Sequence, residues 1–264
     1  MPSLSPYRSD LDYAYAPGMF PAMECLLHRP DLARRLLLHT KSAGTEGAQR
    51  LMELAAKNHV RVEDADRALA RISGKENCFA AAVFEKFDDA LNDLKPHVVL
   101  HNPSDCGNVG TILRTALGFG VEDVALIRPC VDVFDPRVVR ASVGSMFQLR
   151  IHTYDTFADY QADHPAHMLY PFMLDGSKSL PDVLAGEIPE RWTLVFGNEG
   201  SGSVLLAYRH SVPTPPPIAR SKITSQITVS PVEYLIGSNK PAAPQTNPNT
   251  THNMPSASLA DLLL

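Results

Sequence analysis

An asparagine, two glycines and an arginine stand close together in the stretch NPSDCGNVGTILRTALGFG, residues 102–120. Asn108 and Gly110 fall where a loop would enter an apolar helix, and Arg114 follows on the same helix. Free N–H groups at a helix start attract anions, and a glycine lets a ligand approach the backbone closely. This spacing predicts a crevice for an anionic or polar ligand. The alternative, a helix N-cap at Asn108 and a surface charge at Arg114, remains open.

A second polar turn follows an apolar strand in LVFGNEGSG, residues 194–202. Its glycines could wrap a small ligand with backbone amides, and Glu199 could then fix the orientation of that ligand. Taken alone, the stretch is equally compatible with an ordinary turn.

A dinucleotide-binding fingerprint is absent from the first stretch, because its glycines lack the G-x-G-x-x-G spacing. The next apolar strand, VALI, is followed by Arg128 and Pro129 rather than by an acidic residue. A nicotinamide enzyme is therefore disfavoured, although an unrelated nucleotide-binding α/β enzyme remains an alternative.

The elements that must position these residues alternate between strands and helices. Short apolar runs predict strands at 98–100, 124–127, 149–154, 167–174 and 192–197, and helical spacing predicts a helix over 109–120. Such alternation is typical of an α/β fold with a mostly parallel sheet and helices on both faces. Ligands of these sheets bind at the carboxyl ends of the strands.

The first part of the chain predicts a small α/β unit. Apolar residues recur at helical spacing over 20–40 and 47–59, and strand-like pieces follow at 60–64 and 78–84. The basic residues of this unit are interpreted as solvated charges, with an RNA-binding face as the alternative. They are Arg34, Arg35, Lys41, Lys57 and Arg61.

Composition sets further bounds. The formal net charge of −5 disfavours a generally basic nucleic-acid binder, so any RNA contact must be local. The four cysteines lie far apart without a C-x-x-C pair, which predicts free thiols and no metal site. No secretory signal and no run of eighteen apolar residues is found, so a cytoplasmic protein without membrane contact is expected.

The composition changes near residue 212, where prolines become frequent. The run 238–258 offers almost nothing to bury, which predicts a flexible segment. We therefore expect three parts: a small α/β domain at 1–95, a second α/β domain at 96–236 and a flexible tail at 237–264.

Three stretches in this order and spacing, 102–120, DPRVVRASVGSMFQLRI at 135–151 and 194–202, resemble the SpoU-type (TrmH-like) RNA 2′-O-ribose methyltransferases of the SPOUT superfamily. Residues 13–30 and 71–87 more weakly resemble the small ribosomal-protein-like RNA-binding domain that precedes many members. The resemblance implies a homodimer with a C-terminal trefoil knot. It further implies methyl transfer from S-adenosylmethionine to a ribose 2′-OH of ribosomal or transfer RNA.

The same resemblance implies roles for individual residues. The catalytic set is Arg114, Asn108, Glu199 and Ser225. The cofactor-binding set is Leu174, Gly176, Phe196, Gly197, Asn198, Gly200 and Ile218, and the RNA-binding set is Arg114, Arg137, Arg140 and Ser142. In a homodimer the first-motif arginine would gather with Arg128, Arg137 and Arg140 around one cleft. Packing is an equally good interpretation of Arg140 and Ser142.

The chain departs from the family pattern at its third motif. The nearest match is SKITSQITVSPV, residues 221–232, where Ser225 stands for the family's serine and Ile227 for its asparagine. Pro231 lies where a helix would continue, at a cost of about 3 kcal/mol. An RNA-binding protein that has lost catalysis is therefore the alternative function.

Overall fold

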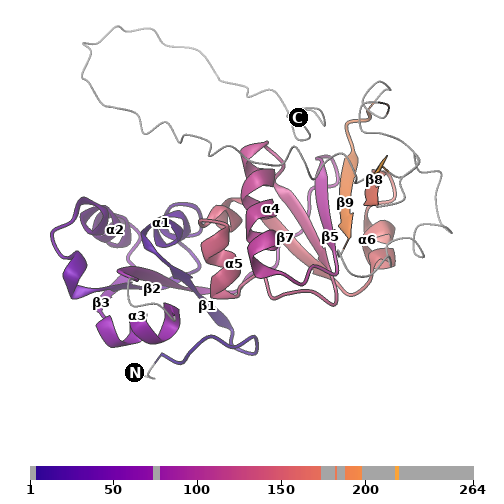
Figure 1. Cartoon of the computed structure of the whole chain (residues 1–264). Helices are drawn as coiled ribbons and strands as arrows, with labels where there is room; N and C mark the ends of the chain where they lie inside the picture. Colours follow the sequence, from indigo (N-terminus) through magenta and orange to yellow (C-terminus); the bar gives the residue numbers. More distant parts are fainter. Residues whose placement is uncertain (1–3, 74–77, 174–181, 183–187, 198–217, 220–264) are drawn as a thin grey trace, which may run out of the picture.

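The computed structural model describes residues 4–73, 78–173, 182, 188–197 and 218–219, which contain two β-sheets joined by a short connecting segment (Figure 1). The predicted tail at 237–264 and the predicted knot lie outside the described residues. Within the described residues, no helix is both long and apolar enough to cross a membrane.

The first sheet has four strands in the order β1-β4-β2-β3. Its strands are β1 (Tyr13–Pro17), β2 (Ala33–Leu38), β3 (Arg61–Asp64) and β4 (Ala80–Glu85), and its helices are α1 (Met19–His28), α2 (Glu46–Lys57) and α3 (Asp66–Ser73). The predicted helix over 47–59 and the strands over 60–64 and 78–84 are confirmed by α2, β3 and β4.

The helical spacing predicted for 20–40 is wrong beyond His28, because β2 follows α1 after a short turn. Pro30 cannot continue a helix, since it lacks the backbone N–H. Leu36 and Leu37 are fully buried in two different clusters, one on each face of the sheet. A strand buried on both faces has a continuous apolar run, which single-sequence periodicity does not separate from a buried helix.

The second sheet has six described strands in the order β10-β8-β9-β5-β6-β7, and every described pairing is parallel. Its strands are β5 (His97–His101), β6 (Asp123–Ile127), β7 (Arg150–Tyr154), β8 (Met168–Met173), β9 (Trp192–Gly197) and β10 (Ile218–Ala219). The mostly parallel α/β fold predicted from the sequence is confirmed.

Helices cover both faces of this sheet. Its helical elements are α4 (Cys106–Gly118), α5 (Pro136–Ala141), a 3-10 turn at Ser145–Gln148 and α6 (Phe157–Asp163). Val109 and Leu113 of α4 join the apolar cluster that contains Val98 and Leu100. Phe157 and Tyr160 of α6 join the cluster on the opposite face. Successive strand residues therefore face different helices.

The order of the strands reverses between β5 and β9. From β5 the chain moves outward to β6 and β7, and it then crosses to the other side, where β9 pairs with β5. At a reversal of this kind the connections of the two strands leave in opposite directions, and open α/β sheets commonly bind their ligands outside the carboxyl ends of these strands.

Arg29 joins the two sheets. Its guanidinium donates to both carboxylate oxygens of Asp89 at 3.1 and 2.6 Å, and to the carbonyls of Phe147 and Leu149 at 3.2 and 3.0 Å. The same group lies 4.7 Å above the ring of Phe87. One arginine of the small unit thus binds both the connecting segment and the edge of the larger domain.

Three buried histidines close the opposite end of the larger sheet. Every ring nitrogen of His97, His164 and His167 has an oxygen partner at 2.9–3.1 Å. The three rings are close enough to hold a metal ion. Since every one of these ring nitrogens already has a hydrogen-bond partner, the three histidines form a buried hydrogen-bond network in this structure, named here the histidine plug.

Candidate active site

The carboxyl end of β5 leads into the loop that starts α4. Asn102 follows His101 with a left-handed φ of 55°, and its N–H donates to the carbonyl of Ile127 at 3.1 Å. The Val131 N–H donates to the Pro103 carbonyl at 2.9 Å. These bonds tie the loop to the neighbouring β6 and to the chain that follows it, so the start of α4 has a fixed position.

Asp105, rather than Asn108, is the N-cap of α4. Its Oδ1 accepts the N–H of Asn108 at 2.7 Å. The N-cap interpretation of Asn108 is therefore wrong, because a carboxylate three residues earlier already holds that position. The side chain of Asn108 is exposed and has no hydrogen-bond partner among the described residues.

Arg114 lies on the exposed side of α4 and has no hydrogen-bond or ion-pair partner among the described residues. Six residues of helix place Arg114 and Asn108 about 120° apart around the axis. The Cα–Cβ bonds of a helix are tilted toward its N-terminus, so the side chain of Arg114 leaves the backbone toward the loop end of α4.

At Gly110 the backbone of α4 lies tightly against α5. A Cβ atom at this position would lie 2.4 Å from the Cβ of Ala141 and 2.7 Å from the N of Ser142. Both values are far below a carbon contact distance. The second glycine of the motif is therefore required for helix packing, whereas Gly107 is exposed.

Gly197 stands directly beside His101, because β9 and β5 are in register with these residues as partners. One row further in, Ile218, Phe172, Phe196 and Leu100 are successive partners across four strands. The rings of Phe172 and Phe196 are stacked with centroids 4.8 Å apart. The described members of the predicted cofactor-binding set thus lie at one edge of the sheet, next to the loop that starts α4.

Two polar atoms at this edge are buried without a partner among the described residues. They are Nδ1 of His101 and Oδ1 of Asn102. Burial lowers the pKa of His101, so its imidazole is neutral at neutral pH. A buried acceptor without a donor is costly, and it is often explained by a ligand.

The sequence prediction did not include either of these two residues. Asn102 was part of the quoted motif, but its burial depends on the neighbouring strands. The only local signal was a polar pair directly after a buried strand.

The residues predicted to contact RNA from α5 differ in exposure. Arg137 is exposed and its guanidinium is paired with Asp135 at 2.8 Å. Arg140 is half-buried at the end of α5. Ser142 is fully buried and its hydroxyl donates to the carbonyl of Val139 at 2.9 Å. The packing interpretation therefore fits Ser142, and the RNA contact predicted for it does not, because its side chain does not reach the surface.

The remaining predicted site residues lie outside the described residues. They are Leu174, Gly176, Asn198, Glu199, Gly200 and Ser225. The roles predicted for them stay predictions, as does the effect of the altered third motif.

Comparison with known proteins finds similarity to rRNA methyltransferases. Residues 95–210 match the model of the SpoU rRNA Methylase family. The chain is 46% identical to mouse "rRNA methyltransferase 3, mitochondrial" over 54 residues, 20% of this chain and 13% of that protein. It is 30% identical over 110 residues to a 23S rRNA (uridine(2479)-2'-O)-methyltransferase of Streptomyces viridochromogenes, 40% of this chain and 38% of that protein. The chain thus covers less than two fifths of either relative.

A solved structure shares the fold. The SpoU methyltransferase AviRb from Streptomyces viridochromogenes, in complex with the cofactor AdoMet, aligns with a TM-score of 0.62 at 20% identity. The alignment covers 79% of this chain and 80% of that one. The segment matched by the family model, residues 95–210, includes β5, β9 and the loop that starts α4. Over residues 95–210, this chain is similar to the SpoU rRNA Methylase family.

Proposed function

We propose that this chain transfers a methyl group from S-adenosylmethionine to a ribose 2′-OH of RNA, with ribosomal RNA as the first candidate substrate. One observation carries the proposal: the strand order reverses at β5 and β9, and the predicted motif residues that are described lie at or beside the carboxyl ends of these two strands. The 2′-O position is supported by the named activity of the Streptomyces relative. A homodimer and a cytoplasmic location remain proposals.

The residues at the carboxyl ends of β5 and β9 fit the proposed cofactor. S-adenosylmethionine supplies a methyl group on a positively charged sulfur, together with amino and hydroxyl donors. The unpartnered acceptors on His101 and Asn102 match such donors in kind. Phe196, Gly197 and the backbone of Ile218 would hold the same molecule at the sheet edge, where Gly197 presents no side chain.

Arg114 would act on the RNA. A ribose hydroxyl is a weak acid, so its attack on a methyl group requires alignment and stabilisation of the developing negative charge. The guanidinium stays charged and offers paired donors that match a phosphate. We therefore assign Arg114 the clamping of the target phosphate and the stabilisation of the developing charge, rather than proton removal.

The first experiment measures cofactor affinity. Calorimetric titration of the full chain with S-adenosylmethionine should give saturable binding in the micromolar range. A chain that binds RNA but shows no heat with the cofactor would support the alternative, an RNA-binding protein without catalysis.

The second experiment measures methyl transfer into ribosomal RNA, with 2′-O-methylnucleosides detected after digestion. Arg114→Ala should lower the rate by roughly 10²–10³-fold, in the range known for loss of one charge-stabilising donor. Its cofactor affinity and melting temperature should match the parent protein. Arg50→Ala is the matched control, since Arg50 is exposed on α2 and pairs only with nearby Glu53. Equal rates in Arg114→Ala and the parent would refute the role of Arg114.

A further inference from the structure

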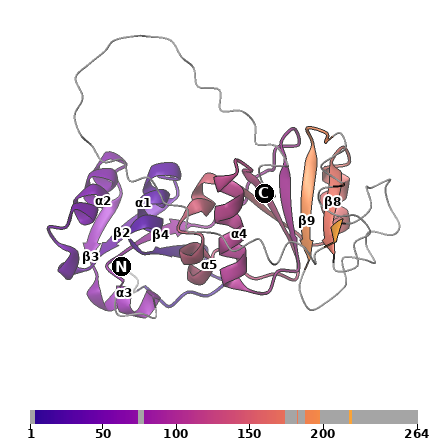
Figure 2. The same cartoon turned by 45° about the horizontal axis from the view of Figure 1, so that its top comes forward.

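A pocket of about 340 Å³ lies between the start of α1 and the end of α5. It is formed by residues of both units of the chain. The lining residues are Pro17, Gly18, Met19, Phe20, Pro21, Cys78, Arg140 and Val143. Figures 1 and 2 both show α5 at the place where the small sheet meets the larger domain.

The chemistry of the lining is mostly apolar. Phe20 has 69% of its surface exposed, which is unusual for a large aromatic residue. Arg140 provides the one positive charge of the lining, and no carboxylate lines the pocket. An exposed aromatic ring and a guanidinium that line one pocket can together stack a base and hold its phosphate.

The far wall of the pocket is held in an unusual backbone conformation. Val143 has a left-handed φ of 55° and is 37% exposed. A β-branched residue in this region is a real outlier, and such strain persists where the surroundings enforce it. The next residue, Gly144, lies tightly against α1, since a Cβ there would lie 2.9 Å from the Cα of Pro21 and 2.8 Å from the Cβ of Glu24. Close contact with α1 thus presents Val143 to the pocket.

Two lining residues of the pocket lie beside the contact between α5 and α4. Arg140 and Val143 flank Ala141 and Ser142, the residues against which Gly110 of α4 packs. Gly110 belongs to the same stretch as Asn108, at the loop end of α4. A nucleic acid strand at the candidate active site could therefore continue across the end of α5 into the pocket.

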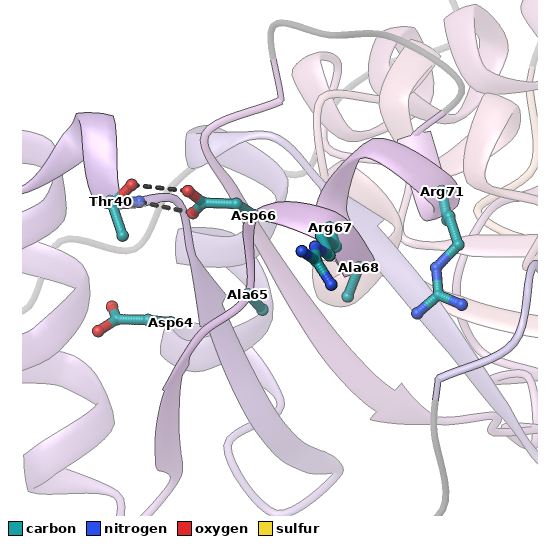
Figure 3. A pocket seen from close by; sticks show the side chains of 7 residues that line it. All are labelled: Thr40, Asp64, Ala65, Asp66, Arg67, Ala68 and Arg71. Atoms are coloured by element: carbon teal, nitrogen blue, oxygen red, sulfur yellow. Dashed lines mark hydrogen bonds between the residues drawn. The ribbon is translucent and has the colours of Figure 1, made fainter.

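A second pocket, of about 430 Å³, has a different character (Figure 3). Arg67 and Arg71 line it, but so do Asp64 and Asp66. The carboxylate of Asp66 accepts the N–H and the hydroxyl of Thr40 at 2.8 and 2.7 Å, and these bonds lower the pKa of Asp66. Two carboxylates oppose a phosphate backbone, so this pocket is the weaker candidate for RNA.

We propose that the pocket between α1 and α5 receives an unpaired RNA base, stacked on Phe20 with an adjacent phosphate near Arg140. The inference rests on the proposed function and specifies where the substrate is held next to the target ribose. Single-stranded bases of RNA are recognised by stacking on aromatic and arginine side chains, which supports this choice of occupant.

A fluorescence experiment tests the contact directly. The chain has one tryptophan, Trp192, which is 3% exposed and gives a constant background. Phe20→Trp places an indole in the pocket, and stacked bases of oligo(A) or oligo(U) RNA should quench it. Leu27→Trp is the matched control, because Leu27 is 44% exposed on the same helix and does not line the pocket. Its emission should not change with RNA.

An affinity measurement tests independently whether an RNA base stacks at position 20. By fluorescence anisotropy, Phe20→Ala should bind the same RNAs about tenfold or more weakly, the loss expected for one stacked base. Leu27→Ala and Phe20→Trp should bind as the parent does. Melting temperatures of all variants should agree, since both side chains are exposed.

Three results would overturn the inference. They are equal quenching in both tryptophan variants, equal RNA affinity of Phe20→Ala and the parent, and a change of Phe20→Trp emission with protein concentration alone. The last would identify a second copy of the chain as the occupant. If the parent binds S-adenosylmethionine while any of these is found, only this inference fails. If the parent does not bind the cofactor, the proposed function fails.

Discussion

At the residue scale, two arginines show how the same side chain serves different purposes. Arg150 donates twice at 2.6 Å to Asp123, a fully buried carboxylate, and this pairing raises the pKa of Arg150. Its donors are used inside the fold. Arg114 is exposed and has no partner among the described residues. A guanidinium that binds a substrate phosphate must keep its donors available, and Arg114 meets this requirement whereas Arg150 does not.

The histidine plug gives a pH prediction at the same scale. Burial, followed by the neighbouring His167, lowers the pKa of His97 to about 4. The unfolded chain takes up this proton near pH 6.5 and the folded chain only near pH 4. The contribution of neutral His97 to the free energy of unfolding is therefore complete above pH 6.5, and it is lost as the pH falls from 6.5 to about 4. Over this range the free energy of unfolding falls by about 3 kcal/mol. The other groups facing the ring are His164, Asp93, Asp123, Tyr160 and Arg191.

Urea unfolding between about pH 7.5 and about pH 4.5 measures this loss. His97→Gln should be less stable than the parent at the upper pH but should lose less stability on acidification. His28→Gln is the control for the substitution itself, since the side chain of His28 is 39% exposed and lies outside this histidine group. If the unfolding free energy of His97→Gln falls with pH as steeply as that of the parent, His97 is not the source of the acid-dependent loss.

At the element scale, the position of α4 depends on how closely it can approach α5. The Asp105 cap sets the start of α4, and Gly110 permits the contact with Ala141. Since α4 carries Asn108 and Arg114, the packing of two helices determines where the proposed catalytic side chains stand. The glycine of the motif therefore has a structural role that its sequence neighbours do not reveal.

Replacing Gly110 with alanine should disturb both stability and site. The added Cβ would lie 2.4 Å from a side-chain carbon and 2.7–2.8 Å from backbone atoms of α5, so the helices must separate. Overpacking of this kind costs about 1–3 kcal/mol of unfolding free energy. Gly118→Ala on the same helix is the control, because nothing lies within 4 Å of its added Cβ. It should be neutral or stabilising by up to about 1 kcal/mol. Urea unfolding and calorimetric cofactor affinity would be measured for both, and equal stabilities would contradict this view of α4.

At the scale of the whole molecule, Arg29 connects the small unit to the larger domain. Tyr7 and Lys86 add a second contact, since both donate to Asp132 after β6. The pocket proposed for an RNA base lies along the same joint. A joint held by several hydrogen bonds keeps the two units at a fixed orientation, which a shared RNA surface requires.

Arg29→Ala should loosen this joint. It removes both bonds to Asp89, two bonds to backbone carbonyls and the contact with Phe87, and it leaves a carboxylate with 20% exposure unpaired. We expect a loss of about 3 kcal/mol of unfolding free energy. Arg34→Ala is the matched control, since Arg34 also pairs with two carboxylates but only within the small unit.

The control should lose about 1 kcal/mol or less, because its pairs are more exposed. Differential scanning calorimetry and limited proteolysis would follow both variants. Early cleavage between the units is expected for Arg29→Ala only. Similar unfolding and cleavage in the two variants would show that Arg29 does not hold the joint.

The sequence by itself determined five strands of the larger domain, β5 to β9, and the helix α4, because strand and helix periodicities are local properties of short segments. It misassigned Ala33–Leu38, whose strand form depends on burial between two other strands. Only the tertiary structure decided that His101 lies beside Gly197, that Gly110 touches α5, and that Arg29 joins the two units. These contacts link residues far apart in the chain. Their free energy comes from burial and pairing between segments, which no local pattern of residues encodes.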